Sequence, residues 1–446
     1  MRNARKFLKL VTVLGASAAL MATSACQSGS LSGSGNNNAS GGEVTTIKFL
    51  HTNDATNTAL AKALSDAFNA SQTKYKVTLE SRPGGTEGDN LVKTRLSTGE
   101  MTDVFIYNSG SLLNNLNPTK NLIALGDEAY VKDYTKPFTI AVTSSADKKI
   151  YGAPFGAGSG GGIMYNKKVY ADLGLKVPNT WDEFMANNAK IKAAGKTAVL
   201  QTYGTTWTSQ LFVLADFANI NASDPNWGAD YTANKKKYSN APALAGFQHT
   251  EDVFKAGYVN SDAAQLTLDN GLKKLAAGDA VHYPILSGTI TTVQQNSPDK
   301  VNDLGFFPIP TTLGATSTLT TWVPGAFYIP TTTKDKKLEA VKAFVTYAES
   351  ADGCKAQLSA VSPNGPFGMA NCVPTGNLPP VAQDVFSYSS KNAFGPALEF
   401  ISPLKGPNLE SIIILVGTGQ KTAVQAAGLY DEDLKKQAAQ LNLPGW

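Results

Sequence analysis

Residues 103–107 read Asp-Val-Phe-Ile-Tyr, and this short apolar run completes the pattern that decides the fold. A strand that is apolar on both faces is typical of a parallel sheet, which helices cover on both sides. Before it, residues 46–51 and 77–79 predict two further strands. Apolar residues at a spacing of four predict a helix over 60–68, and a second helix begins at Leu91. This alternation of strands and helices predicts a doubly wound α/β unit.

A second α/β unit is predicted in the middle of the chain. Thr180 and Glu183 form a capping box that starts a helix, and strands are predicted at 198–201 and 280–283. The glycines of 156–162 suit either a close approach to a ligand or a flexible crossover between two units. Further helices are predicted over residues 208–219, 334–349 and 421–441.

The first 25 residues predict an export signal that is not part of the fold. Basic residues precede an apolar run at 10–21, which is too short to span a bilayer, and small residues follow it. Cys26, directly after Ser24-Ala25, resembles the lipobox cysteine of bacterial lipoproteins, which implies that its thiol carries a lipid. An ordinary signal with a chance cysteine is the alternative. Residues 26–43 are mostly Ser, Gly and Asn and predict a flexible tether with a reach of roughly 20 Å.

The charge of the chain resides in this signal. The full sequence has 39 Lys and Arg against 35 Asp and Glu, a formal charge of +4. Residues 1–25 carry four of the basic residues and no acidic ones, so the rest is balanced at 35 against 35. A balanced body has no long-range attraction for phosphates, and we expect no nucleic-acid partner. We expect membrane attachment through the lipid alone, on the outer face of a bacterial cell.

The ends of the predicted strands supply the first candidate ligand contacts. In doubly wound sheets, ligands bind at the carboxyl ends of the strands. The residues at these positions are Asn53, Asp54, Glu87, Tyr107, Asn108 and Ser109. Capping of the next helix is the alternative for Asn53 and Asp54.

Catalytic and cofactor motifs do not fit the sequence. The pattern G-x-G-x-x-G at 156–161 is followed by an extended segment, not by a helix, which argues against a dinucleotide site. The three histidines, His51, His249 and His282, form no zinc motif, and there is no G-x-S-x-G elbow. His51 and His282 lie near strand ends, where each faces either a ligand or the core. We expect no metal and no cofactor.

Residues 163–168, Ile-Met-Tyr-Asn-Lys-Lys, together with 173–175 and 178–184, resemble the most characteristic stretch of the family 1 extracellular solute-binding proteins. These are the carbohydrate-binding components of ABC importers. Weaker matches lie at 96–99, 103–104, 151–154, 278–280, 305–310 and 337–348. The chain departs from the family after 280–283, where a tryptophan is common and Pro284 stands instead, and it matches only loosely after Cys372.

The resemblance implies a periplasmic-binding-protein-like fold, with two doubly wound α/β lobes joined by a hinge and a ligand cleft between them. We expect residues 44–155 with 305–361 to form the first lobe, and 156–304 with 362–446 to form the second. The crossings between lobes are expected near 155–162 and 306–310.

Sugar recognition requires flat aromatic surfaces for the apolar ring faces and polar groups for the hydroxyls. Candidates later in the chain are Trp207, Trp227, Tyr283, Trp322, Asn364 and Phe367. Trp207 has glycine and hydroxyl neighbours, with a buried position at a helix start as the alternative. Trp322 lies where family members commonly pass through the cleft.

Cys354 and Cys372 remain after Cys26 is assigned to the lipid. Two cysteines in an exported domain predict a disulfide, worth roughly 3 kcal/mol, with two free thiols as the alternative.

The sequence thus predicts a monomeric, non-enzymatic solute-binding lipoprotein. Its expected partners are a neutral oligosaccharide and the permease subunits of an ABC transporter. A surface-anchored glycoside hydrolase is the alternative, since two catalytic carboxylates can lie far apart in a sequence. An adhesive lipoprotein is a third hypothesis.

Overall fold

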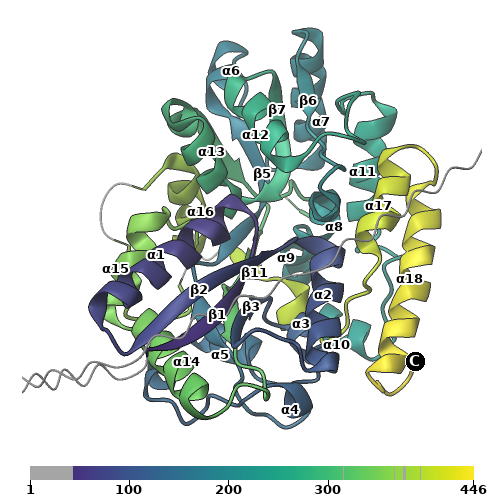
Figure 1. Ribbon diagram of the computed structural model, residues 1–446. Helices are drawn as coiled ribbons and strands as arrows, with labels where there is room; N and C mark the ends of the chain where they lie inside the picture. Colours follow the sequence, from purple (N-terminus) through teal and green to yellow (C-terminus); the bar gives the residue numbers. More distant parts are fainter. Residues whose placement is uncertain (1–43, 315, 366, 375–377, 392) are drawn as a thin grey trace, which may run out of the picture. The chain divides into compact units, whose positions relative to one another are not determined.

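The computed structural model describes residues 44–446 except 315, 366, 375–377 and 392 (Figure 1). The predicted export signal, Cys26 and the tether lie outside the described residues. No helix in the described part of the chain is long and apolar enough to cross a lipid bilayer.

The first sheet has the strand order β2-β1-β3-β10-β4. Strand β1 pairs in parallel with β2 and β3, whereas β10 is antiparallel to β3 and β4. The strands are β1 (Thr45–Thr52), β2 (Tyr75–Arg82), β3 (Val104–Tyr107), β4 (Ala153–Phe155) and β10 (Gly325–Tyr328). The predicted order of strands and helices at the start of the chain is therefore confirmed.

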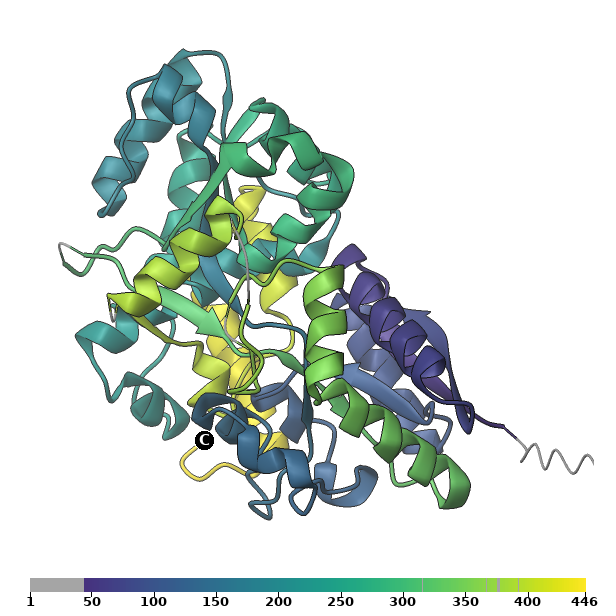
Figure 2. The same cartoon turned by 90° about the vertical axis from the view of Figure 1, so that its left-hand side faces the viewer.

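Helices α1 (Ala55–Ser71), α14 (Asp335–Ala348) and α15 (Ala351–Ala360) pack beside this sheet. Figure 2 shows α1, in purple, against the green helices from much later in the chain. Beneath them, Phe49 contacts Phe155, Phe327 and Phe344 with ring centroids 5.3 to 5.9 Å apart. The remaining helices between the strands of this sheet are α2 (Gly85–Thr98), α3 (Ser111–Asn114), α4 (Pro118–Asn121), η1 (Ala129–Asp133) and α5 (Lys136–Ala141).

The second sheet has the order β11-β9-β5-β7-β6, with β8 also paired to β5. Its strands are β5 (Ser159–Asn166), β6 (Thr197–Val199), β7 (Ala280–Leu286), β8 (Leu304–Phe307), β9 (Leu319–Trp322) and β11 (Phe394–Pro396). The nearby helices are α6 (Lys167–Asp172), α7 (Trp181–Ala193), η2 (Thr206–Gln210), α8 (Leu211–Leu214), α12 (Leu268–Ala277), η3 (Ser287–Thr289), α13 (Ile290–Asn296), η4 (Pro298–Asp303) and α16 (Pro380–Ser390). The capping box of Thr180 and Glu183 is present at the start of α7.

The glycines that the sequence placed in a crossover or ligand loop lie largely within β5. They make room for side chains and backbone of neighbouring strands. A Cβ on Gly161 would lie 2.2 Å from Cζ3 of Trp322, and one on Gly162 would lie 2.3 Å from the carbonyl oxygen of Phe307. Both distances are far below van der Waals contact, so the close packing of β5 against β9 and β8 requires glycine at these positions.

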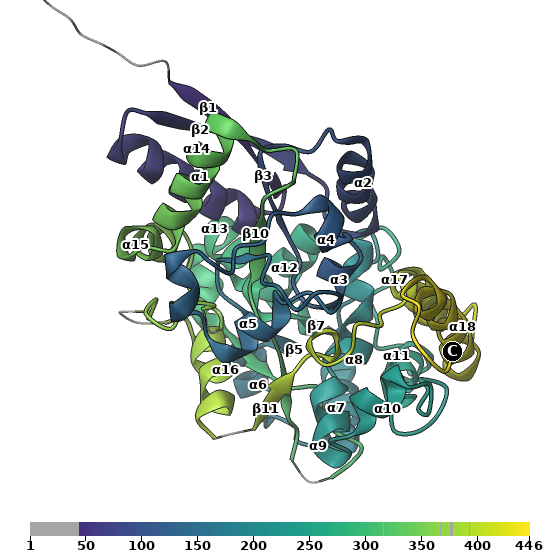
Figure 3. The same cartoon turned by 90° about the horizontal axis from the view of Figure 1, so that it is seen from below.

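A further helical layer belongs to the second lobe, with its own core around Trp227, Tyr231, Tyr238 and Tyr430. It consists of α9 (Phe217–Ser223), α10 (Trp227–Thr232), α11 (Ala245–Lys255), η5 (Leu398–Phe400), α17 (Leu409–Gly417) and α18 (Ala423–Gln440). Figure 3 shows α17 and α18 beside α11, which they contact.

The sheet pairing corrects the expected division between lobes. Strands β8 and β9 both pair with β5, so residues 304–322 belong to the second sheet and not to the first lobe. The second crossing therefore lies at 323–324, between β9 and β10, and not at 306–310. Residues 362–372, expected in the second lobe, include Phe367, Met369 and Cys372 of the first core.

Candidate functional site

The carboxyl end of β1 presents Asn53 and Asp54, which are both exposed. Asp54 is the N-cap of α1: its Oδ1 accepts a hydrogen bond from the backbone N–H of Asn57 at 3.0 Å. Its Oδ2 accepts from Thr52 Oγ1 at 2.6 Å and from Asn57 Nδ2 at 2.8 Å. The capping alternative therefore describes Asp54 in this structure, although its carboxylate remains open to solvent.

A buried arginine at the end of β2 is a feature that the sequence reasoning missed. Arg82 is 5% exposed, and its Nη1 donates to the carbonyl oxygen of Pro83 at 2.9 Å. Its guanidinium lies 5.6 Å from the ring centroid of Tyr107, and its Nε has no hydrogen-bond partner among the described residues. Burial lowers the pKa of Arg82, while the charge of Asp89 opposes this effect. Gly88 provides the space, because a Cβ there would lie 2.4 Å from Nη1.

The three candidates at the end of β3 differ in accessibility. Tyr107 is buried, which raises the pKa of its hydroxyl well above the ordinary value, with the charge of Asp89 adding to the effect. Ser109 is also buried and donates from Oγ to the carbonyl oxygen of Pro324 at 3.0 Å, so it ties this edge to the second crossing. Asn108 is exposed. Of the three, Asn108 has the side chain available to a ligand.

Facing this edge from the second lobe is Glu410, near the start of α17. Its Oε2 accepts a hydrogen bond from Thr206 Oγ1 at 2.5 Å, and Gln210 Nε2 lies 3.4 Å from its Oε1. A Cβ on Gly85, the first residue of α2, would lie 3.8 Å from Oε2, so the two lobes meet here. Burial raises the pKa of Glu410, and the charge of Asp89 raises it further.

Charged groups therefore surround the place where α2 approaches η2. The negative charge of Asp89 raises the pKa of both Arg82 and Glu410, and Glu87 lies exposed in the first turn of α2. The expectation of a neutral ligand rested on the residues at the strand ends and in the loops, and did not include Arg82 or Glu410. Carboxylates accept hydrogen bonds and guanidinium groups donate them, which suits a ligand rich in hydroxyl groups.

Two tryptophans of the second lobe remain candidates for stacking. Trp207 lies in η2, beside Thr206, and is only partly buried. Trp322 ends β9, is also partly buried, and packs over Gly161 immediately before the second crossing. Both tryptophans pack against the core of the second lobe and retain partial exposure to solvent.

The structure contradicts the placement of Trp227 and Tyr283 among the ligand contacts. Trp227 is fully buried and stacks on Tyr231 at 5.0 Å, with Tyr238 edge-on at 5.4 Å. Tyr283 is fully buried in β7 and bonds to the hydroxyl of Thr202. Apolar packing encloses both rings, which leaves no face for a sugar.

Asn364 and Phe367 lie on the segment that leads from the first lobe to the second. Asn364 is 4% exposed and Phe367 is 7% exposed. Phe367 forms an isolated β-bridge with Ala157 in the first crossing. These residues thus contact the hinge instead of lining an open surface, because the β-bridge of Phe367 with Ala157 joins segments about 210 residues apart and has no local signal in the sequence.

The histidines occupy core positions. His282 Nε2 lies 2.6 Å from the Tyr170 hydroxyl, and its Nδ1 lies 2.7 Å from Asn188 Oδ1. His249 stacks on Trp181 with centroids 3.7 Å apart. Burial lowers the pKa of His249 and of His282 to about 3. Within the described residues, no group of three or more His, Cys, Asp or Glu side chains is arranged to hold a metal ion.

Comparison with known proteins identifies similar chains. A sequence model of the bacterial extracellular solute-binding proteins matches residues 52–353. The multiple sugar-binding protein of Streptococcus mutans is 28% identical over 184 residues, which are 40% of this chain and 42% of the relative. The match therefore spans about two fifths of that relative's length.

Solved structures share the fold. A chitin oligosaccharide binding protein superposes with a TM-score of 0.77 at 20% identity, covering 89% of this chain and 100% of that one. The solute-binding protein RafE in complex with raffinose gives a TM-score of 0.73 at 21% identity, covering 88% and 100%. These likenesses confirm the predicted two-lobed α/β fold.

Proposed function

Because the chain belongs to the bacterial extracellular solute-binding proteins, we propose that it binds an oligosaccharide between its two lobes for delivery to an ABC transporter permease. The observation that carries this proposal is the meeting of polar strand ends from the first lobe with the Trp207 and Glu410 region of the second. The named sugar-binding relative and the raffinose-bound structure support the ligand class.

Binding would follow from closure of the lobes. A ligand that contacts both lobes binds the closed form better than the open form and shifts the population toward closure. The crossings at 155–159 and 323–324 connect the sheets and are the places where backbone rotation would move one lobe against the other. A permease that recognises the closed form would then receive only loaded protein.

The available groups favour an uncharged, hydroxyl-rich ligand. Trp207 and Trp322 offer apolar faces for pyranose rings. Asn53, Asn108 and the open edge of the Asp54 carboxylate offer donors and acceptors from the first lobe. The carboxylates of Asp54, Glu87, Asp89 and Glu410 outnumber the single guanidinium of Arg82 here, so the site disfavours an anionic ligand and offers acceptors for hydroxyl groups.

The chain would act outside the cytoplasmic membrane. The family is extracellular, and a lipid on Cys26 with the tether to residue 43 would hold the body near the outer membrane face. We propose a monomer that carries out no chemical step on its ligand.

Calorimetric titration with a panel of neutral oligosaccharides tests the function. We expect micromolar or tighter binding of at least one member by the chain from residue 27 onward. Tight binding of a peptide or an inorganic ion, with none of any sugar, would contradict the ligand class. Release of reducing sugar from the same oligosaccharides during incubation would instead indicate a glycoside hydrolase.

A further inference from the structure

A third segment connects the lobes besides the two crossings. It runs from α15, which packs on α1 in the first lobe, toward α16, which packs on β8 in the second. We call residues 361–365 and 367–372 the strap. The strap follows the first crossing closely: a Cβ on Gly365 would lie 2.6 Å from the carbonyl oxygen of Gly158, and Phe367 bridges to Ala157. Any movement at the first crossing must therefore displace the strap as well.

The beginning of the strap is bound to the second lobe. Ser287, in η3, donates from Oγ to the carbonyl oxygen of Asn364 at 2.9 Å. The same Ser287 oxygen accepts the backbone N–H of Gly160 in β5, also at 2.9 Å. Gln294 Nε2 donates to Ser362 Oγ at 2.8 Å. One serine hydroxyl of η3 thus joins the strap to β5, directly after the first crossing.

The end of the strap returns to the first lobe. The backbone N–H of Thr135 donates to Gly368 O at 2.8 Å, and that of Ala370 donates to Asp133 O at 2.8 Å. Cys372 then forms a disulfide with Cys354 of α15 across a sequence separation of 18 residues. Besides the backbone that continues from α15, the disulfide cross-links the end of the strap to the first lobe, while the side-chain contacts of the strap with η3 and α13 of the second lobe are hydrogen bonds.

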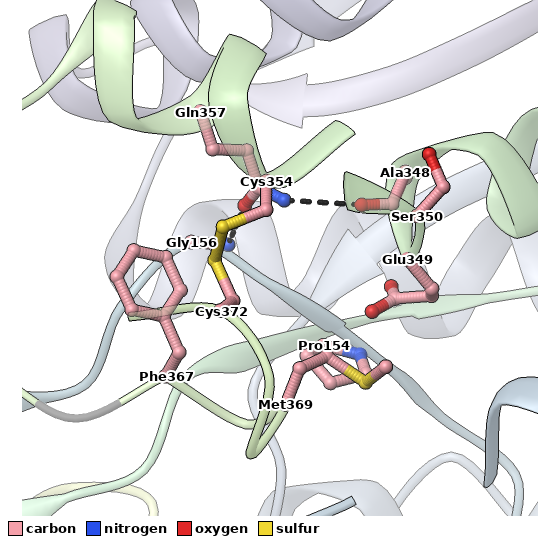
Figure 4. A pocket seen from close by; sticks show the side chains of 10 residues that line it. All are labelled: Pro154, Gly156, Ala348, Glu349, Ser350, Cys354, Gln357, Phe367, Met369 and Cys372. Carbon is pink, nitrogen blue, oxygen red and sulfur yellow. Dashed lines mark hydrogen bonds between the residues drawn. A yellow bond between two sulfur atoms is a disulfide. The ribbon is translucent and has the colours of Figure 1, made fainter. Parts of the chain in front are cut away.

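The strap does not fill all the space beside α15 near the disulfide. Figure 4 shows a small cavity between the strap and α15, lined by Cys354, Cys372, Phe367 and Met369. Its volume of about 10 Å³ is close to that of one water position. Glu349 also lines it, 6% exposed, with an Oε1 that has no partner among the described residues, and burial raises the pKa of this carboxyl well above its ordinary value.

We propose that the Cys354–Cys372 disulfide and Ser287 are positioning elements for ligand binding, because they hold the strap between the lobes and limit how far the lobes separate. This rests on the lobe closure of the proposed function. With both attachments intact, the open form has fewer arrangements, and closure loses less conformational entropy. Loss of either attachment widens the open ensemble and thereby weakens ligand binding.

The test compares Cys354→Ser/Cys372→Ser, Ser287→Ala and the combination of both. We expect each to weaken oligosaccharide binding by roughly threefold to tenfold. This is about the entropic cost of ordering one more side chain when the lobes close. Because both act on one strap, the combination should weaken binding by much less than the product of the two effects. Ser359→Ala is the matched control, because the Ser359 hydroxyl donates to Ala356 O within α15 and not to the strap. The affinity of this variant for the oligosaccharide should be unchanged.

A second readout does not depend on the ligand. Dyes on azide-bearing residues introduced at positions 76 and 176, which are exposed on the first and second lobes, report the distance between lobes by energy transfer. The unliganded variants should show a broader distribution of distances than the wild type. The proposal would be overturned if the variants lost thermal stability but kept the affinity and the distance distribution of the wild type. It would also be overturned if the combined variant weakened binding by the full product of the two separate effects. If the wild type binds no sugar, the proposed function fails, while the distance distribution still decides the role of the strap.

Discussion

Replacement of Asp216 by asparagine should change how stability depends on pH. Asp216 is 2% exposed, directly before α9, and its Oδ1 accepts a hydrogen bond from Asn219 Nδ2 at 2.8 Å. Burial raises the pKa of Asp216 to about 7, and the hydrogen bond opposes this only in part. The folded protein therefore holds a proton on this carboxyl at a pH where the unfolded chain has released it.

The sign follows from proton linkage. Between about pH 4 and pH 7 the folded state binds more protons at Asp216 than the unfolded state, so raising the pH destabilises the fold. A shift of about three pKa units corresponds to about 4 kcal/mol across this window. Asparagine keeps the acceptor for Asn219 and has no proton to lose. The free energy of unfolding of Asp216→Asn, relative to wild type, should therefore rise by up to about 4 kcal/mol from pH 4 to pH 8.

Thermal unfolding at a series of pH values measures this difference. For roughly 400 residues that unfold together, about 4 kcal/mol corresponds to about 5 °C in the unfolding midpoint. His249 and His282, whose pKa values are lowered to about 3, destabilise both proteins equally as the pH falls below about 6.5, and they cancel in the comparison. The exposed Asp127→Asn is the control and should stay parallel to wild type. Parallel curves for Asp216→Asn would refute the reasoning.

Five other substitutions separate the site from the core. Trp322→Ala and Trp207→Ala should each weaken oligosaccharide binding about tenfold or more in calorimetry, since each removes an aromatic face; unchanged affinity would remove that residue from the site. Trp227→Ala should lower the free energy of unfolding by about 3–5 kcal/mol and leave the affinity of the folded protein unchanged; a selective loss of affinity would return Trp227 to the site. Gly161→Ala should lower the free energy of unfolding by about 1–3 kcal/mol and displace the Trp322 ring. Gly428→Ala is its control: a Cβ there, in α18, meets open space, so the free energy of unfolding should rise by about 1 kcal/mol. Equal effects of the two substitutions in chemical denaturation would contradict this packing.

The first lobe was predictable because its signals are local. Residues 104–107 are apolar throughout, and the parallel pairing of β1 with β2 and β3 follows from short alternating segments. The capping box at Thr180 is equally local and is present. Features of this kind depend on residues within one or two helical turns of each other, which a single sequence displays directly.

The division between lobes was not predictable in the same way. Residues 304–322 carry no local sign of which sheet they join, and their pairing with β5 joins segments more than 130 residues apart. The position of Trp227 was equally hard to predict from the sequence. Beside Pro225 and Gly228 it has the composition of a loop, yet α10 packs it against Tyr238 and the C-terminal helices. An aromatic residue in a turn-rich segment is compatible with either a ligand or a core.

Arg82 and Glu410 show why charge near the candidate site was underestimated. The predicted second strand ended at Leu79, whereas β2 continues to Arg82 and carries its guanidinium beneath α2. Glu410 reaches η2 across 204 residues of sequence to bond Thr206. Neither contact has a signature in the local pattern, because a charged residue at a strand end or in a first helical turn is ordinary.

The glycines of β5 connect the candidate site with the hinge. Gly161 sets the position of the Trp322 ring, and the chain enters the first sheet at Gly325, three residues after Trp322. The backbone N–H of the adjacent Gly160 donates a hydrogen bond to Ser287, which also holds the strap. A shift of β5 relative to the first lobe would therefore move a candidate stacking residue and the third connection together. We therefore expect substitutions at Gly161 and at Ser287 both to change affinity, the first by displacing the ring of the candidate stacking residue Trp322 and the second by releasing the strap.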